Sequence, residues 1–512
     1  MRKQLHCILL ATLVACSKPH ETSDGAANET SNTTVNHPNI VFILTDDLNG
    51  EVYGHMPRLK QLLDDQGTSF LKHHLNISLC CPSRTAILRG QYAHNTQIFS
   101  NGPPTGGFET FFANGEEADA LPVWLNAAKY RTALMGKYLN GYPNTAPKDY
   151  IPPGWTEWDS PVAGSPYGEW NYTLNENGTE HTYGATSADY MVDVISNKAA
   201  DFIRRAAADN VPFYLHLTPY VPHAPATPPN RYLNDFPDAM APRTPSFNED
   251  DVSDKPAWLA GKPKLTKMQR DAIDDLYKRR LRSMEAIQDL VQNVVDTLGQ
   301  TGQLANTYIV FTSDNGFHQG QHRLDSGKNT EFDEDLLVPL IVRGPGVPAG
   351  VTVDLPTVNV DFAPTFVELA GAAVTSSIDG RSLVAAMHGL PMTTPWRQMV
   401  LLQHGGDVPD DEPAARHVDP GTLEPPDTEV QETLATPEPP FEGLRTSRWT
   451  YVELSTGEKE LYDHVHDPDQ LTNIASYPAS GPVMAQLSAL LHNMHGCQGQ
   501  ACRDAEQMTP PP

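Results

Sequence analysis

Basic residues are scarce in this sequence: its 512 residues include 36 Lys and Arg against 63 Asp and Glu, and the formal net charge is −27. A surface this acidic repels polyanions, so the composition excludes a nucleic-acid-binding protein. It also disfavours an anionic ligand unless the few cations are gathered at one place. Arg84, Lys137 and Lys328 are the candidates for that role.

The N-terminal apolar run is too short to cross a membrane. It extends from Cys7 to Val14, whereas a membrane-spanning helix needs about 20 residues. Residues 1–16 instead have the pattern of an export signal. Their ending resembles a bacterial lipobox in which Cys16 becomes the lipidated first residue of the mature protein, and an ordinary cleaved signal peptide is the alternative.

The segment behind this signal lacks apolar residues. Residues 17–37 are rich in Ser, Thr and Asn and are predicted to form a flexible linker. Signal and linker together predict an exported bacterial lipoprotein, periplasmic or anchored at the outer membrane or cell surface. Its contact with the membrane would be through the lipid anchor only.

Cysteine is also scarce, with six residues in the chain. Cys497 and Cys502 flank a short polar loop, which is typical of a disulfide formed in an oxidising compartment. A zinc-binding Cys-x4-Cys pair is the alternative, although no second ligand pair lies nearby. Cys80 and Cys81 do not suit a bond with each other, because adjacent Cα atoms are about 3.8 Å apart and disulfides usually span about 4.4–6.8 Å.

The segment Cys80-Cys81-Pro82-Ser83-Arg84 is the most informative motif in the chain. In a purely structural interpretation, Pro82 fixes a turn and Ser83 caps a helix over residues 85–88. The N-terminus of that helix would face Cys80, where an anion such as sulfate is favoured.

Apolar strands alternate with helical stretches along the chain. This pattern predicts an α/β fold with a mostly parallel central sheet flanked by helices, and ligands in such sheets bind beyond the C-terminal ends of the strands. The clearest helix covers residues 266–298, with apolar side chains at three- and four-residue spacing. The predicted strands cover residues 39–45, 132–135, 212–217, 308–312 and 338–342.

The C-terminal part has a different pattern. Residues 448–454 and 460–463 predict two strands of a small antiparallel sheet, and residues 483–492 predict a helix. Residues 405–440 are rich in Pro, Glu and Asp and predict a long, partly disordered surface loop.

Carboxylates follow two of the predicted strands. Asp46 and Asp47 end one strand, and Asp314 and Asn315 end another. This oxygen-only set suits Ca2+, or less well Mg2+, more than zinc. Three converging carboxylates would repel one another without a cation. The alternative is that each Asp caps a following helix.

Several segments, taken in order, resemble the type I sulfatase family, and within it the N-acetylglucosamine-6-sulfatases and the extracellular heparan sulfatases. The resemblance covers roughly residues 38–505 and implies an alkaline phosphatase-like fold. It implies a catalytic domain over residues 38–395 and a C-terminal subdomain over residues 396–512. The segments that carry it are Leu79–Asn95, Gly136–Tyr142, Asn171–Thr173, Asn306–Gln321 and Val338–Gly346.

In this family a formylglycine-generating enzyme oxidises the first cysteine of the motif, here Cys80, to Cα-formylglycine. The hydrated aldehyde has two hydroxyls on one carbon: one attacks sulfur, and the other later expels sulfate as the aldehyde re-forms. The resemblance implies that Asp46, Asp47, Asp314 and Asn315 hold Ca2+, with residue 80 completing the coordination sphere.

The resemblance also assigns roles to basic residues and to one acid. Arg84 would orient the formylglycine, and Lys137, His223 and Lys328 would contact the sulfate oxygens. Asp314 would be the base that activates the nucleophile, and His223 or Lys328 would protonate the leaving alkoxide.

One position departs from the family pattern. Many sulfatases have Gly-Lys-x-His, with the histidine assisting the final elimination, whereas this chain has Leu139 there, followed by Asn140. His318 is a candidate for the missing base, although a lone histidine is as often structural. Asn140 and His318 are expected to contact the substrate.

The expected activity is hydrolysis of sulfate esters, on a small sulfated sugar such as an amino sugar or glycosaminoglycan fragment, or on an aryl sulfate. One alternative is a phosphate or phosphonate monoester hydrolase of the same fold. Phosphatase relatives usually have a Ser or Thr nucleophile, two zinc ions and more His ligands. The other alternative is an inactive glycan-binding surface lipoprotein.

Overall fold

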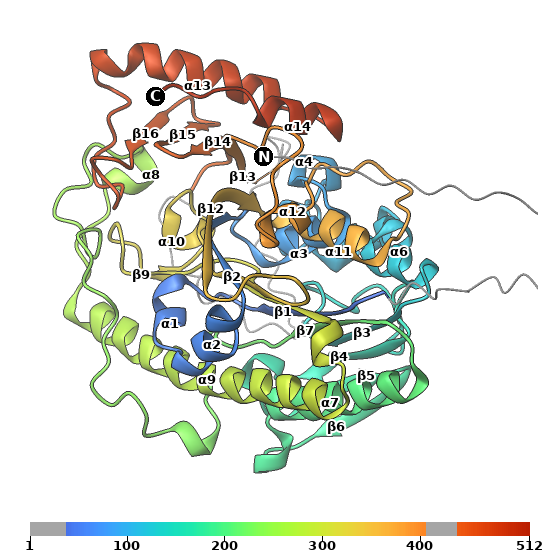
Figure 1. The fold of residues 1–512 in the computed structure, drawn as a ribbon. Helices are drawn as coiled ribbons and strands as arrows, with labels where there is room; N and C mark the ends of the chain where they lie inside the picture. Colours follow the sequence, from blue (N-terminus) through green and yellow to red (C-terminus); the bar gives the residue numbers. More distant parts are fainter. Residues whose placement is uncertain (1–36, 406–437) are drawn as a thin grey trace, which may run out of the picture. The chain divides into compact units, whose positions relative to one another are not determined.

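The computed structural model describes residues 37–405 and 438–512 (Figure 1). The predicted signal peptide, nearly all of the predicted linker and most of the predicted acidic loop lie outside the described residues. Among the described residues, no helix combines the length and apolar character needed to cross a membrane. Residues 37–512 form a single packed unit.

A ten-stranded sheet runs through the middle of this unit, in the order β12-β2-β11-β8-β1-β7-β3-β4-β5-β6. Its four central strands, β8, β1, β7 and β3, are mutually parallel. The predicted α/β fold with a mostly parallel sheet is therefore confirmed. The strands are β1 (Asn39–Thr45), β2 (Thr68–His74), β3 (Arg131–Gly136), β4 (Glu157–Gly164), β5 (Tyr172–Glu176), β6 (Thr179–Tyr183), β7 (Phe213–Thr218), β8 (Thr307–Ser313), β11 (Leu340–Arg343) and β12 (Val351–Val358).

Strand β1 lies at the centre because every one of its seven residues is buried. Its side chains alternate between two apolar cores, one on each face of the sheet. Val41 and Ile43 pack in the core of one face, whereas Ile40 and Phe42 pack in the core of the other.

Helices cover both faces of the sheet. Figure 1 shows α7 (Met191–Asp209) and α9 (Lys267–Gln300) on one face, and α3 (Cys80–Arg89), α6 (Leu121–Ala127) and α11 (Phe362–Ala370) on the other. The predicted helix over residues 266–298 is α9; Thr266 and Gln269 form a capping box at its start. The shorter helices are α1 (Gly50–Gly54), α2 (Pro57–Leu62), α4 (Ala93–Thr96), α5 (Gly107–Ala113), α8 (Ala257–Ala260), α10 (Asp333–Leu336) and α12 (Val384–Met387).

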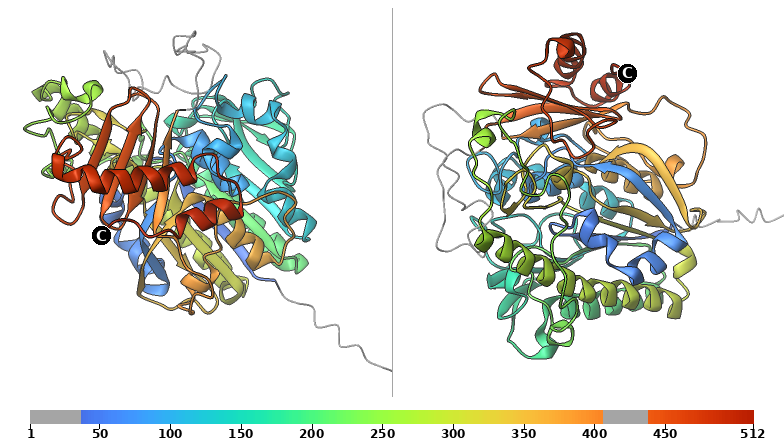
Figure 2. Two further views of the ribbon diagram at one scale, coloured as in Figure 1. Left: turned by 90° about the horizontal axis from the view of Figure 1, so that it is seen from above. Right: turned by 90° about the vertical axis from the view of Figure 1, so that its left-hand side faces the viewer.

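The small C-terminal antiparallel sheet has four strands, not the two that the sequence predicted. They are β13 (Met399–His404), β14 (Phe441–Thr446), β15 (Trp449–Leu454) and β16 (Lys459–Asp463), paired in that order. Strands β13 and β14 flank the acidic segment, whose composition obscured them. Helix α13 (Gly481–Met494) packs on this sheet, and α14 (Gln500–Glu506) follows it (Figure 2).

Strand β11 corrects one detail of the prediction. It starts at Leu340 rather than residue 338 and runs antiparallel to both β8 and β2. Its C-terminal end therefore lies at the opposite edge of the sheet from the ends of the four parallel strands.

A buried group of charges, here called the joint cluster, connects the C-terminal part to the rest of the fold. It consists of Arg397, Asp361, Glu506 and Arg381. Arg397 donates to both carboxylates, with Nη2–Oδ1 at 2.7 Å to Asp361 and Nε–Oε2 at 3.0 Å to Glu506. Arg381 Nε donates to the same Glu506 oxygen at 3.0 Å. These bonds fasten α14 to the start of α11.

Candidate active site

Four parallel strands end at the same edge of the sheet, and their following loops bring together the polar residues that the sequence singled out. Every one of these side chains is at most 4% exposed. Such an edge is the usual ligand-binding position in an open α/β sheet. The residues are Lys137 after β3, His223 after β7, Asp46 and Asp47 after β1, and Asp314 and Asn315 after β8.

Helix α3 brings the candidate nucleophile to this edge. The helix starts at Cys80 itself, with Leu79 at the N-cap, so the predicted capping role of Ser83 is wrong. Cys80 Sγ lies 3.4 Å from Asp46 Oδ1 and 3.0 Å from Lys328 Nζ. Residue 80 thus stands at a helix N-terminus between a carboxylate and an ammonium group.

Each of the three carboxylates has its own basic partner. Lys137 Nζ lies 2.8 Å from Asp46 Oδ2. Lys328 Nζ lies 2.7 Å from Asp47 Oδ1. Arg84 Nε donates to Asp314 Oδ2 at 2.8 Å. The few cations of this acidic chain are therefore concentrated where the sequence placed them, and they balance the charge that the carboxylates bring.

Burial and these neighbours shift the pKa values of the site's ionisable groups, some upward and some downward. Burial alone would raise the pKa of Asp46, but Lys137, His223 and Arg84 hold it below its usual value. Burial and the adjacent Asp46 raise the pKa of Asp314. Burial also raises the pKa of the Cys80 thiol well above its usual range, despite Lys137 and Lys328. An unmodified Cys80 is therefore protonated, which makes it a weak nucleophile.

Two oxygens of the site are buried and accept no hydrogen bond from the described residues: Asp47 Oδ2 and Asn315 Oδ1. Ligand atoms of Asp46, Asp47, Cys80 and His223 all lie within 4.8 Å of one another, a spacing that a single ion can bridge. Hard oxygen donors with unused lone pairs fit Ca2+ or Mg2+. The group could therefore hold a metal ion, with oxygen atoms from Asp46 and Asp47 beside the Cys80 sulfur and a His223 nitrogen.

Arg280 is a residue of this site that the sequence analysis missed. It lies on the buried face of α9, and its Nη2 donates to the Asp47 carbonyl at 2.5 Å. Its guanidinium also stacks on Phe317 at 4.1 Å. Asp47 has a φ of 66°, a conformation that a non-glycine residue rarely adopts. Arg280 helps to hold it there. The signal available was an arginine within the apolar stripe of that helix.

Two tyrosines, also missed, surround the sulfate-binding candidates. Lys137 Nζ lies 5.1 Å from the ring centroid of Tyr167 and 5.9 Å from that of Tyr220. The rings of Tyr167 and His223 are 4.6 Å apart. Tyr167 belongs to a loop segment without a recognisable spacing, so the sequence offered no signal for it.

The residues around the family's missing histidine occupy different environments. Leu139 is 3% exposed and packs in the apolar core on the α3 face of the sheet, away from any polar role. Asn140 is equally buried, and its Oδ1 accepts no hydrogen bond from the described residues. His318 is 6% exposed and its Nδ1 lies 2.9 Å from Asp335 Oδ2.

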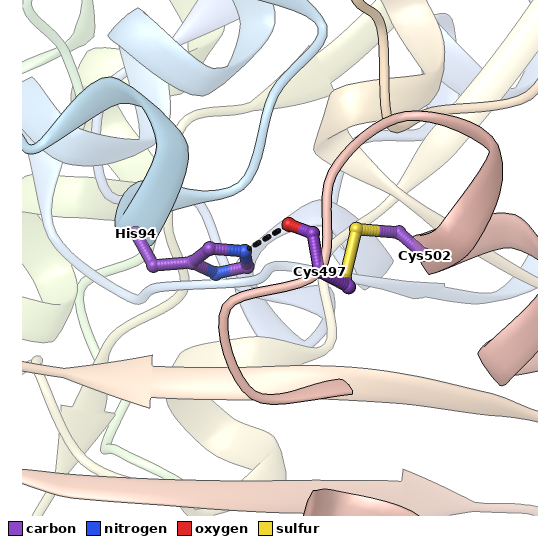
Figure 3. Close-up of side chains that lie close together, drawn as sticks. All are labelled: His94, Cys497 and Cys502. Atoms are coloured by element: carbon purple, nitrogen blue, oxygen red, sulfur yellow. Dashed lines mark hydrogen bonds between the residues drawn. A yellow bond between two sulfur atoms is a disulfide. The ribbon is translucent and has the colours of Figure 1, made fainter. Parts of the chain in front are cut away.

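A second group with metal-ligating atoms lies near the C-terminus (Figure 3). It contains His94, Cys497 and Cys502, but the two sulfurs are joined in a disulfide. The His94 Nε2 atom lies 2.8 Å from the Cys497 carbonyl oxygen. The sulfurs are therefore not available to zinc, and the disulfide loop instead fastens α4 to the C-terminal segment.

Comparisons with known proteins agree with this geometry. A family model described as Sulfatase matches residues 38–372. The chain is 32% identical to N-acetylglucosamine-6-sulfatase of Homo sapiens over 484 residues, which covers 91% of this chain and 86% of the human protein. It is 34% identical to an extracellular sulfatase homologue of Caenorhabditis elegans over 379 residues, covering 72% of this chain and 52% of that relative, about half of its length.

Solved structures share the fold. A protein in complex with its substrate D-glucosamine-2-N,6-O-disulfate superimposes with a TM-score of 0.72 at 22% identity, over 91% of this chain and 98% of that chain. Phosphonate monoester hydrolase from Silicibacter pomeroyi gives 0.69 at 23% identity, over 90% and 96%. The sheet, the small C-terminal sheet and the extent of the match show that the fold is the alkaline phosphatase-like one. With the family model and the relatives, they show that the chain belongs to the sulfatase family and is a sulfuric ester hydrolase.

Proposed function

We propose that this protein hydrolyses sulfate esters of amino sugars or glycosaminoglycan fragments, with a formylglycine derived from Cys80 and a bound Ca2+. The observation that carries the proposal is the position of Cys80. Its Sγ is 3.4 Å from Asp46 and 3.0 Å from Lys328, at the N-terminus of α3. A buried, protonated thiol would be a poor reagent there, whereas an aldehyde hydrate would be an effective one.

The substrate class rests on the relatives. N-acetylglucosamine-6-sulfatases of Homo sapiens and Capra hircus align with 91% and 92% of this chain, and a protein of the same fold was solved with a disulfated glucosamine. A 6-sulfated glucosamine is therefore the first substrate to test. Extracellular relatives also support export of this chain, and the lipid anchor at Cys16 remains a prediction from the sequence.

When bound, Ca2+ and the formylglycine supply an electrophilic centre for the sulfuryl oxygens and a geminal diol as nucleophile. Asp46, Asp47, Asp314 and Asn315 would hold the ion together with residue 80. Asp47 and Asn315 have the unused oxygens for it.

The remaining roles belong to groups already in place. Asp314, with its raised pKa, is suited to accept the proton of the attacking hydroxyl. Arg84 fixes Asp314 through its Nε and donates Nη1 to the Lys137 carbonyl at 2.9 Å. Lys137 and Lys328 hold positive charge on two sides of the nucleophile, where sulfate oxygens would lie. His223 or Lys328 would donate the proton to the leaving alkoxide.

A phosphonate monoester hydrolase is the second candidate, because one shares this fold. The residues present count against a two-zinc phosphatase of this fold. The cluster of ligand atoms at the site contains one histidine, His223, among two carboxylates and Cys80, whereas a two-zinc phosphatase site needs more nitrogen ligands.

The test starts with mass spectrometry of the tryptic peptide His73–Arg84 from protein expressed with a formylglycine-generating enzyme. We expect formylglycine at residue 80, and turnover of glucosamine 6-sulfate faster than that of glucosamine 6-phosphate. Cys80→Ala should lower kcat by at least about 10^4-fold, because the nucleophile is lost. Cys81→Ala is the matched control, since Cys81 is equally buried and lies in the same helix turn. An intact thiol in active protein, or faster phosphate turnover, would overturn the proposal.

A further inference from the structure

The side of the active site that carries Lys328 has little regular structure to support it. Lys328 follows a hairpin of two very short strands, β9 (His318–Gln319) and β10 (Ser326–Gly327), in which Gly327 pairs with His318. Strands of only two residues each are too short to hold a side chain in place by themselves. Lys328 nevertheless reaches both Cys80 and Asp47, at 3.0 Å and 2.7 Å. Something else must hold this hairpin.

We propose that Asp335 is the positioning residue for this half of the site, an inference that rests on the proposed function. Its side chain is completely buried on α10. One carboxylate oxygen lies 2.9 Å from His318 Nδ1, and the same oxygen accepts from Thr330 N at 3.1 Å and Thr330 Oγ1 at 2.6 Å. His318 pairs with the residue before Lys328, and Thr330 is two residues after it. A single carboxylate thus fastens the chain on both sides of Lys328.

The backbone of the same helix supports the metal-binding loop. Gly316 N donates to the Asp335 carbonyl and Phe317 N to the Glu334 carbonyl, each at 2.9 Å. A Cβ at Gly316 would lie 2.2 Å from the Glu334 carbonyl oxygen, so only glycine allows this approach. Asp314 and Asn315 directly precede Gly316. Helix α10 therefore connects the candidate metal ligands, His318 and Lys328.

The contact also determines what His318 can do. A neutral imidazole has one protonated nitrogen, and a carboxylate at Nδ1 selects the tautomer with the proton there. Nε2 is then left as an acceptor. Since Leu139 replaces the usual histidine of the family pattern and is packed in the apolar core, an oriented His318 would provide a proton acceptor from another element. Asp335 acts through His318 and Lys328 and need not touch the substrate.

The experiment compares wild-type enzyme, verified to contain formylglycine, with Asp335→Asn, using an aryl sulfate and measuring kcat, KM and inhibition by inorganic sulfate. Outer-shell partners of functional groups typically contribute about 10–100-fold, so we expect kcat/KM to fall by about that factor. Sulfate inhibition should weaken as well, because Lys328 loses its support. In combination with His318→Ala, the loss should be less than the product of the two separate losses.

Asp361→Asn is the matched control, because Asp361 is also a completely buried, fully bonded aspartate but belongs to the joint cluster. It should lower thermal stability and leave the kinetic constants of the folded enzyme unchanged. If Asp335→Asn does not fold, Thr330→Val decides, since it removes one donor and should still lower kcat/KM several-fold. Unchanged kinetics in the Asp335 or Thr330 variant of an active wild type would overturn this inference alone. A wild type with formylglycine that hydrolyses no sulfate ester would overturn the proposed function instead.

Discussion

The joint cluster and the active-site cluster both pair buried acids with basic side chains, but they differ in how many of their oxygens accept hydrogen bonds from the described residues. In the joint cluster, both oxygens of Asp361 and both oxygens of Glu506 accept hydrogen bonds. In the active-site cluster, Asp47 Oδ2 and Asn315 Oδ1 accept none from the described residues. A buried polar atom without a partner is costly, and at this site a bound cation would satisfy both oxygens.

This difference separates charged side chains that stabilise the fold from those that are available to a ligand. Arg397 is fully buried and bonds to two acids, as a bidentate arginine in a fold-stabilising cluster should. At the sheet edge, burial and Asp47 oppose the lowering that Lys137 and His223 impose on the pKa of Asp46, and burial raises the pKa of Asp314. The joint cluster is complete without a ligand, whereas the active-site cluster keeps two buried oxygens for which a bound cation would be a partner.

Substituting one residue in each cluster should give the largest difference in stability and activity between the two clusters. Arg397→Met leaves the buried Asp361 without its cation and Glu506 with Arg381 alone, and should lower the free energy of unfolding by about 3–5 kcal/mol. Asp47→Asn also weakens a buried ion pair, that with Lys328, but it keeps an oxygen that can accept from Lys328 Nζ and removes one of three neighbouring negative charges, so its loss of unfolding free energy should be the smaller of the two. Activity should follow the opposite order: lost in Asp47→Asn and kept by folded Arg397→Met. Chemical denaturation and kinetics measure both, and similar stability losses in the two variants would contradict the distinction.

Calcium binding should also distinguish the two clusters, through a smaller change in the free energy of unfolding. Chelator-treated protein should gain about 2.7 kcal/mol of unfolding free energy at a Ca2+ concentration 100 times its Kd. Asp47→Asn should lose most of this gain, because the substitution removes a carboxylate ligand. Thermal unfolding with and without Ca2+ measures the effect. Asp361→Asn is the control and should respond like the wild type; a response that survives in Asp47→Asn would place the ion elsewhere.

The smallest expected effect concerns pH at a second contact between the C-terminal sheet and the rest of the fold. Here Arg445 forms a two-bond pair with Asp333, at 2.9 and 3.0 Å, and His464 lies beside it. Burial and Arg445 lower the pKa of His464 to about 4. Between about pH 6.5 and 4 the unfolded chain binds a proton that the folded chain does not, so stability falls as the pH falls through this window.

His464→Gln should remove that part of the slope. When the pH falls from 7 to 5, the wild type should therefore lose roughly 1–2 kcal/mol more unfolding free energy than the variant. Urea denaturation at the two pH values measures it. His466→Gln is the control, because the His466 side chain is 72% exposed. An equal shift in both variants would show that burial of His464 is not the cause.

The fold class and most of the candidate site residues could be predicted from the sequence. Unbroken apolar strands such as Asn39–Thr45 are recognisable because burial on both faces of a parallel sheet demands them. The carboxylates were recognisable because they follow strands, whose ends lie at one edge of a parallel sheet. Cys80 and Lys137 were recognisable through the resemblance of their segments to the sulfatase family. Strands β13 and β14 were missed, since half-buried strands beside an acidic segment have a weaker pattern.

Which acidic and basic side chains pair with each other, and which oxygens accept no hydrogen bond, could be seen only in the folded structure. Arg280 is 233 residues from Asp47 in the chain, and Asp335 is 17 residues from His318. An arginine in the apolar stripe of its helix marks Arg280 as unusual, but its local sequence does not name Asp47 as its partner, and nothing in the local sequence distinguishes Asp335 from an ordinary helix residue. These features depend on which helices and strands pack together. A hydrogen bond between distant segments forms only when the packed core brings its donor and acceptor atoms within about 3 Å of each other. The residue types of the candidate site are thus recognisable in local sequence, whereas the distances between them depend on how the whole chain packs.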